Sequence, residues 1–288
     1  MKGRQPTEVK RSKPKFILSG KSGAGKTFFM LDFPKPFLID CEGGSVEPQY
    51  VEKMKKVGAW YMGKEDGSQD FKTVIDQLKE LATTKHDYQT LVIDSFSKLY
   101  NLTAAIAEEK VGNVYQADKK EAQKPTRQLQ LWMDRLDMTI CLVCHSKGKW
   151  ENGQPTGTTT FDAWDKLEYD LNLWVELVQT GKRRDIVVRK SRIEGFILGN
   201  SYPAEYDVFA KCFGSDIMAK PAEQVVLATP EQVTEAKRLM GVFNVSEEEQ
   251  KKALKKYDVE QFEELAGPEI TKIIEGLNSK LTTPKGTK

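Results

Sequence analysis

The chain has 288 residues, of which 39% are hydrophobic and 30% charged, enough for one large α/β domain with a small appendage. A formal net charge of +2 excludes a surface coated in positive charge, so nucleic-acid binding would have to come from local patches. No apolar run of about 18 residues and no signal peptide occur, which predicts a soluble cytoplasmic protein without a membrane partner.

The first 13 residues are predicted to form a basic, flexible tail. Residues 1–15 carry one acid, Glu8, against a set of basic side chains: Lys2, Arg4, Lys10, Arg11, Lys13 and Lys15. Such a segment is either a solvated tail or an arm that contacts phosphates.

Strand and helix patterns then alternate to about residue 220. Apolar runs predict strands at 15–19, 36–40, 90–94, 138–144, 171–177 and 185–189, with a weaker one at 57–61. Helical spacing predicts helices from 26 to before 34, at about 70–83 and at 128–136. A polar connection is expected at about 110–126 and a long loop at 146–162. The alternation predicts an α/β fold with a mostly parallel sheet flanked by helices.

Four cysteines occur, and two of them form a C-x-x-C pair, Cys141 and Cys144. The pair lies in an apolar run, where residues three apart on a strand face opposite sides. The spacing therefore favours a buried strand over a zinc or redox site. Unpaired buried cysteines are typical of a reducing compartment.

A small helical domain is predicted at 221–281, followed by a disordered tail at 282–288. Residues 229–232 (TPEQ) form a helix start and residues 246–249 (SEEE) a second capping box. Pro268 is expected to open a third helix.

Residues 20–27 match the phosphate-loop motif G-x-x-x-x-G-K-[ST] in full, between an apolar strand and a helix. Small residues let backbone N–H groups converge on phosphate oxygens, and Lys26 is expected to reach the β- and γ-phosphates. Thr27 and Asp94, which ends the run 90–94, are expected to bind Mg²⁺. The alternatives are a chance glycine-rich turn and a helix-capping Asp94. The expected nucleotide contacts are Gly20, Ser22, Gly23, Ala24, Gly25, Lys26 and Thr27.

Further positions carry a family resemblance. Glu42 follows the strand after the P-loop helix, and Ser95 rather than a glutamate follows Asp94. His145 ends a later strand, and Lys190 and Arg192 lie two apart near the end of the run at 185–189. In these features the chain resembles the RecA family of recombination ATPases, in particular the short phage single-strand annealing ATPases. Without the resemblance, the same residues indicate a solvated turn, a core or capping histidine and a basic edge strand.

The resemblance covers roughly residues 13–215 and implies a RecA-like ATPase core at 14–220 that binds ATP and Mg²⁺. It implies catalytic roles for Lys26, for Glu42 as the base that orients water, and for His145 as a γ-phosphate sensor where RecA has glutamine. Lys190 and Arg192 would act like arginine fingers on a neighbouring subunit, so a homo-oligomer with active sites at its interfaces is expected. No counterpart of RecA's large N-terminal domain is expected in these residues, which offer only a short basic tail before the core.

In the RecA family the loop after the sensor contacts DNA. Here that loop offers basic and aromatic groups suited to single-stranded DNA: Lys147, Lys149, Trp150, Asn152 and Phe161. A flexible surface loop is the alternative. The resemblance thus implies a recombination protein that anneals or pairs single strands, in a bacterial host's cytoplasm if phage-encoded. A KaiC- or DnaB-like ATPase that drives a motor or docks a protein partner through its C-terminal domain is a second possibility, and a P-loop small-molecule kinase a third.

Overall fold

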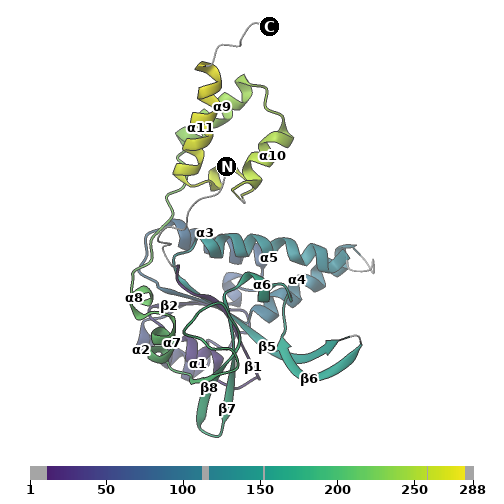
Figure 1. The fold of residues 1–288 in the computed structure, drawn as a ribbon, viewed down its shortest axis with the longest axis vertical. Coiled ribbons are helices and arrows are strands. Elements are labelled where there is room, and N and C mark those ends of the chain that lie inside the picture. Colours follow the sequence, from purple (N-terminus) through teal and green to yellow (C-terminus); the bar gives the residue numbers. More distant parts are fainter. Residues whose placement is uncertain (1–11, 112–116, 152, 258, 283–288) are drawn as a thin grey trace. The chain divides into compact units, whose positions relative to one another are not determined.

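The structure, a computed structural model, describes residues 12–111, 117–151, 153–257 and 259–282. They divide into two compact units, one with the chain up to Glu80 and His86–Glu223, the other with Leu81–Lys85 and the chain from Gln224 onward. Figure 1 shows an α/β arrangement in the first unit and helices in the second. Most of the predicted basic tail lies outside the described residues, but Lys13 is buried and Lys15 opens the first strand.

A nine-stranded sheet forms the first unit among the described residues, in the order β3-β2-β4-β5-β1-β7-β8-β9, with β6 paired to β5. Every neighbouring pair from β3 to β7 is parallel, and the other pairs are antiparallel. The predicted α/β class with a mostly parallel sheet is confirmed. The strands are β1 (Lys15–Gly20), β2 (Pro36–Asp40), β3 (Trp60–Met62), β4 (Thr90–Asp94), β5 (Thr139–Glu151), β6 (Gln154–Phe161), β7 (Leu173–Thr180), β8 (Arg183–Ser191) and β9 (Ser201–Pro203).

Helices cover both faces of the sheet because connections between parallel strands are right-handed. From β1 to β3 the chain moves one way along the sheet, which places α1 and α2 on one face; from β3 to β5 it moves back, which places α3, α4 and α5 on the other (Figure 1). The helices are α1 (Lys26–Met30), α2 (Pro48–Val57), α3 (Phe71–Thr83), α4 (Phe96–Val111), α5 (Ala117–Arg135), α6 (Leu167–Asp170), α7 (Tyr206–Phe213) and α8 (Ser215–Met218), with a short 3₁₀ turn at Lys64–Asp66.

The apolar runs of the sequence form the interior of the first unit. Phe16 of β1, Phe33 and Phe209 of α7 pack with ring centroids 4.9 to 6.3 Å apart. Cys141 and Cys144 are fully buried in β5, and burial raises the pKa of both thiols, that of Cys144 to about 12. Both thiols therefore stay protonated at neutral pH.

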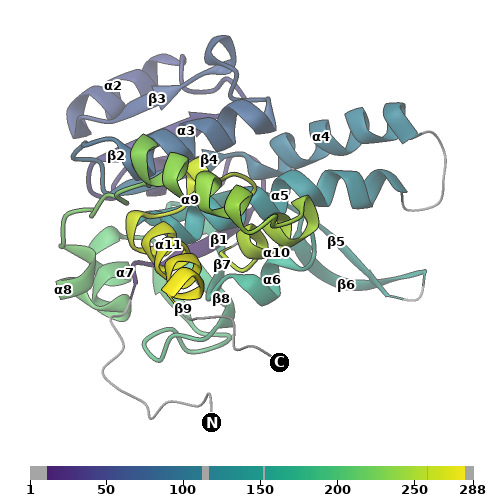
Figure 2. The same ribbon diagram turned by 90° about the horizontal axis from the view of Figure 1, so that it is seen from above.

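Two connections predicted to lack regular structure are in fact regular. The segment 146–162 is mainly a hairpin, in which β5 continues to Glu151 and pairs with β6. Threonines favour the strand, and Gly153 takes the left-handed φ of 78° at the turn. Figure 2 shows this hairpin extending beyond the sheet. Residues 117–127 begin α5, because their alanine, lysine and glutamate content favours a helix despite Pro125.

The second unit contains the three predicted helices, α9 (Pro230–Val242), α10 (Glu247–Lys255) and α11 (Gly267–Thr282), with a 3₁₀ turn at Phe262–Glu264. Both predicted capping boxes are present, at Thr229 and Ser246. A separate apolar core, which includes Leu239 and Ile270, holds the helices together. None of the described helices has both the length and the apolar character needed to cross a membrane.

Candidate functional site

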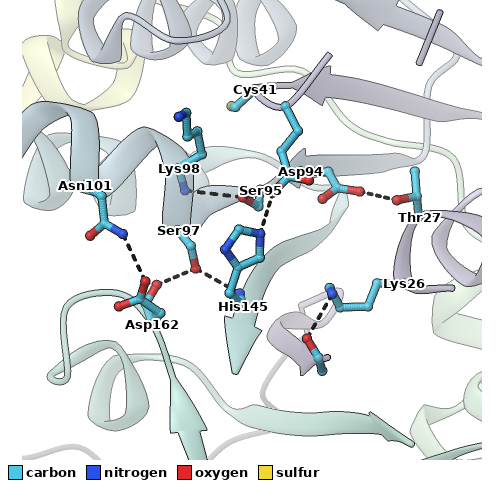
Figure 3. A network of polar contacts seen from close by, with 12 residues as sticks. Lys26, Thr27, Cys41, Asp94, Ser95, Ser97, Lys98, Asn101, His145 and Asp162 are labelled. Carbon is cyan, nitrogen blue, oxygen red and sulfur yellow. Dashed lines mark hydrogen bonds and ion pairs between the residues drawn. The ribbon is translucent and has the colours of Figure 1, made fainter. Parts of the chain in front are cut away.

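The candidate site lies where parallel strands end at one edge of the sheet. The register places Asp40 of β2 opposite Asp94 of β4, and Gly20 of β1 opposite His145 of β5. Because parallel strands point the same way, their carboxyl ends meet although the residues are far apart in sequence. Figure 3 shows the resulting network of polar side chains.

The backbone of the P-loop depends on glycine at two positions. Gly23 and Gly25 have φ of 75° and 95°, in the left-handed region that other residues rarely adopt. Gly25 is followed directly by α1, whose first N–H groups have no partner within the helix. A Cβ at Gly25 would also lie 2.8 Å from Nε of Arg184, so the exposed Arg184 side chain would have to move to admit a larger residue.

Lys26 is buried at the start of α1. Its Nζ donates hydrogen bonds to the carbonyl oxygens of Gly20 at 2.9 Å and Lys21 at 3.0 Å. Burial lowers the pKa of this ammonium group, and the negative charges of Asp94 and Glu42 oppose that shift. Carbonyl partners that a phosphate oxygen can replace make Lys26 available to an anion in the loop.

Thr27 and Asp94 meet at the end of β4. The Thr27 hydroxyl donates to Oδ2 of Asp94 at 2.5 Å. Burial, with a smaller contribution from Glu42, raises the pKa of Asp94 to about 6, although the Thr27 hydrogen bond opposes the shift. A hydroxyl and a carboxylate are the hard oxygen donors that Mg²⁺ uses when it keeps several of its waters, so these residues fit the ion.

Asp94 should cost stability in the absence of metal. The pKa of Asp94 in the folded protein lies above the ordinary value of 3.8. The free energy of unfolding therefore falls as pH rises from about 4 to 6, and above pH 6 the whole loss is present. Asp94→Asn is therefore expected to raise the free energy of unfolding near neutral pH by at most about 3 kcal/mol, since one pKa unit corresponds to about 1.4 kcal/mol. Urea unfolding of both proteins at two pH values measures it. An equal gain below about pH 4 would contradict the cause given.

Asp40 shapes the turn that carries Glu42. Its buried carboxylate accepts backbone N–H groups of Glu42 at 3.0 Å, Gly43 at 2.7 Å and Ser45 at 2.7 Å. Asp40 was assigned no role from the sequence, although an aspartate at a strand end before a Gly-Gly pair is a typical turn signal. It positions Glu42 at the sheet edge.

Glu42 contacts two of the other polar residues at this edge. Its Oε1 accepts a hydrogen bond from the Ser95 hydroxyl at 2.6 Å and also contacts Nε2 of His145. The side chains of Glu42 and His145 are 44% and 45% exposed, so solvent reaches this carboxylate. The structure thus brings together five residues singled out from the sequence: Lys26, Thr27, Glu42, Asp94 and His145.

Hydrogen bonds continue from His145 towards the β5–β6 hairpin (Figure 3). The His145 N–H donates to Oγ of Ser97 at 2.9 Å, and the Asp162 N–H donates to the His145 carbonyl at 2.8 Å. The Ser97 hydroxyl donates to the Asp162 carbonyl. Asn101 and Lys147 contact the Asp162 carboxylate at 2.9 and 3.1 Å. No local pattern marks Ser97, Asn101 or Asp162 as functional, since only the fold makes them neighbours.

Lys190 and Arg192 contact a different segment. Nζ of Lys190 donates to the carbonyl of Leu171, and Nη2 of Arg192 donates to the carbonyl of Tyr169 at 2.8 Å. Burial, and then repulsion by Arg192, lowers the pKa of Lys190. These contacts turn both cations towards residues 169–171 rather than the P-loop of their own chain.

Arg189, the residue before Lys190, lies beside the P-loop instead. It lines a cavity of about 460 Å³ together with residues 21–24 and Glu176 of β7. Its Nε and Nη2 donate to Oε2 of the buried Glu176 at 2.8 and 2.5 Å. No local pattern marks either residue as functional, because only the antiparallel pairing of β7 with β8, whose register shifts between Trp174 and Val175, brings them together.

The hairpin residues predicted to contact DNA differ in accessibility. Trp150 is 65% exposed. Lys147 and Lys149 are paired with Asp162 and Glu151, at 3.1 and 2.7 Å. Residue 152 lies outside the described residues.

Phe161 does not suit the role predicted for it. It is 1% exposed and packs edge-on against Trp174, with ring centroids 5.1 Å apart. A ring enclosed in this way has no free face for a base, so its burial speaks against a DNA contact. Phe161 anchors the base of the hairpin instead.

Comparison with known proteins gives a family match. The model of a family described as an AAA domain matches residues 12–237. No curated protein matches the chain. Among the solved structures, 101 chains match this protein. One, titled "Crystal structure of the RadB recombinase", is 16% identical with a TM-score of 0.44, and the match covers 66% of this chain and 86% of that one.

Proposed function

The chain belongs to the AAA-domain family, and we propose that it is a RecA-like ATPase that binds single-stranded DNA and promotes annealing or strand pairing. The observation that carries the proposal is the contact of Glu42 with Ser95 and His145 at the edge where Lys26, Thr27 and Asp94 also lie. A half-exposed carboxylate beside a phosphate-binding loop suits the activation of water.

The P-loop holds the phosphates of ATP in this proposal. Backbone N–H groups of residues 20–27 bind phosphate oxygens, and Lys26 exchanges its carbonyl partners for the β- and γ-phosphates. Thr27 and Asp94 would hold Mg²⁺, which would neutralise charge on the phosphates.

Glu42 orients a water molecule and accepts its proton as the water attacks the γ-phosphate. The Ser95 hydroxyl holds one oxygen of Glu42, which leaves the other for water. His145 touches the same carboxylate, and this contact supports its proposed role as a sensor of the γ-phosphate.

Lys190 and Arg192 are proposed to complete the site of a neighbouring subunit. Their orientation towards residues 169–171 of their own chain is compatible with this role in a homo-oligomer. Two cations that reach the γ-phosphate across an interface would stabilise the charge of the transition state.

Single-stranded DNA is proposed to bind the β5–β6 hairpin. Trp150 presents an exposed ring on which a base can stack, and Lys147 and Lys149 lie on the same strand. The test is the ATPase rate with and without single-stranded DNA at several salt concentrations. Stimulation that weakens with salt supports the proposal, because phosphate contacts release counterions. A rate indifferent to DNA, together with no binding at low salt, overturns the DNA part.

Trp150→Ala is expected to weaken single-stranded DNA binding by roughly 5- to 150-fold, because one base–aromatic stack contributes about 1–3 kcal/mol. Fluorescence anisotropy with a labelled oligonucleotide measures the affinity. Trp60 of β3 is also 65% exposed but lies outside the hairpin, so Trp60→Ala is the matched control and should bind normally. Equal losses in both variants would show that the effect is not specific to the hairpin.

A further inference from the structure

The carboxylate of Asp162 joins two parts of the first unit. Oδ1 contacts Nζ of Lys147 on β5 at 3.1 Å, and Oδ2 accepts from Nδ2 of Asn101 on α4 at 2.9 Å. Through this one side chain the hairpin cation is tied to α4, the helix that follows the Asp94–Ser95 segment of the nucleotide site.

The backbone of Asp162 is tied to the nucleotide site as well. Its N–H donates to the carbonyl of His145 at 2.8 Å, and its carbonyl accepts from Ser97, which in turn accepts the His145 N–H at 2.9 Å. His145 touches Glu42. A change in the position of Asp162 can therefore be transmitted to the carboxylate of Glu42, with His145 as the one residue between them.

We propose that Asp162 is a positioning residue that holds Lys147 in the absence of DNA and passes the arrival of a nucleic-acid phosphate on to His145 and Glu42. The inference rests on the proposed function and adds to it how DNA alters hydrolysis. A phosphate that binds Lys147 breaks the ion pair between Lys147 and Asp162. The carboxylate of Asp162 is then no longer held to Lys147, and the backbone hydrogen bond between Asp162 and His145 shifts.

The exposure of the ion pair allows this exchange. The side chains of Lys147 and Asp162 are 44% and 27% exposed, and ion pairs open to water contribute little to stability. A phosphate within the high negative charge of a nucleic acid can therefore compete for the lysine. The contacts of Asp162 to Asn101, Ser97 and His145 do not involve Lys147, so they can carry the change after the lysine leaves.

Asp162→Asn is the central variant. The amide keeps the shape, the backbone contacts and an acceptor for Asn101, but it no longer attracts Lys147 by charge. Hydrolysis without DNA is expected to rise at least about fivefold, the lower end of allosteric couplings. Affinity for single-stranded DNA is expected to rise, and the ratio of DNA-stimulated to basal rate to fall towards one.

Glu151→Gln is the matched control. Glu151 pairs with Lys149 on the same hairpin at 2.7 Å, and its described ion pair does not lead to α4. This variant removes the same charge and is expected to raise DNA affinity while the stimulation ratio stays as in the unmodified protein. A merely structural role of Asp162 would lower activity or stability and would not raise the basal rate.

Lys147→Gln breaks the same ion pair from the other side and serves if Asp162→Asn does not fold. It should raise the basal rate while DNA affinity and stimulation fall. The inference is overturned if the basal rate is unchanged in whichever of Asp162→Asn and Lys147→Gln folds, or if Asp162→Asn and Glu151→Gln give equal stimulation ratios. Either result leaves the proposed function standing. Absence of single-stranded DNA binding by the unmodified protein overturns both.

Discussion

Glu42→Gln is expected to slow ATP hydrolysis by roughly 10²- to 10⁴-fold, the usual contribution of a general base, while ATP still binds. Glutamine retains the size of the side chain and can still accept the Ser95 hydrogen bond, but it cannot take a proton from water. Single-turnover hydrolysis measures the chemical step, and binding of a fluorescent ATP analogue measures affinity. Only the first should change by orders of magnitude.

The neighbouring acid Glu47 provides the control for this result. It is exposed at the start of α2, with no contact to Ser95 or His145 among its described hydrogen bonds. Glu47→Gln should hydrolyse ATP at the unmodified rate. If Glu42→Gln also turns over normally, another group activates the water and the assignment is wrong.

Lys26→Ala should reduce hydrolysis by at least about 100-fold, comparable with the loss of one preorganised charge-stabilising group, and should weaken ATP binding as well. Lys26 is the buried cation at the mouth of the loop, and its carbonyl partners show that it is held there before a phosphate arrives. Steady-state rates and nucleotide titrations check both effects. Lys21→Ala is the control, because Lys21 supplies Lys26 only with a backbone carbonyl.

A mixing experiment with this variant tests the proposed contribution of Lys190 from a neighbouring subunit. Lys190→Ala alone should also be slow. In a mixture with Lys26→Ala, some interfaces combine an intact P-loop from one subunit with an intact Lys190 from the other. Partial recovery of hydrolysis is expected. No recovery at any ratio of the two proteins would argue against action across an interface.

Most strands could be predicted from the sequence because buried strands consist of short runs of apolar residues. The strands at 15–19, 36–40 and 90–94 occur within one residue of their predicted ends. Strands with one exposed face were harder to predict: β6 was missed since its residues are polar and exposed along most of its length. Helix α2 was missed as well, although Pro48 at its start is a typical signal.

The site could be predicted only where one local motif implies one chemistry. The motif at residues 20–27 specifies both its backbone shape and its residue types, so the roles of Lys26 and Thr27 could be predicted from spacing alone. The role of Asp94 could be predicted from its position at the end of an apolar strand. Glu42 and His145 were singled out by resemblance, and their contact with each other needed the fold. Phe161 was misjudged because its aromatic character is visible in the sequence while its burial against Trp174 is not.

The sequence by itself determined the P-loop, the parallel α/β class and the three C-terminal helices, because each depends on residues within a few positions of one another. Only the tertiary structure decided which side chains share the sheet edge. The register of β1, β2, β4 and β5 brings Glu42 to His145 across 103 positions of sequence and places Asp162 between the hairpin and α4. Such contacts depend on strand order and crossover direction, which no local pattern encodes.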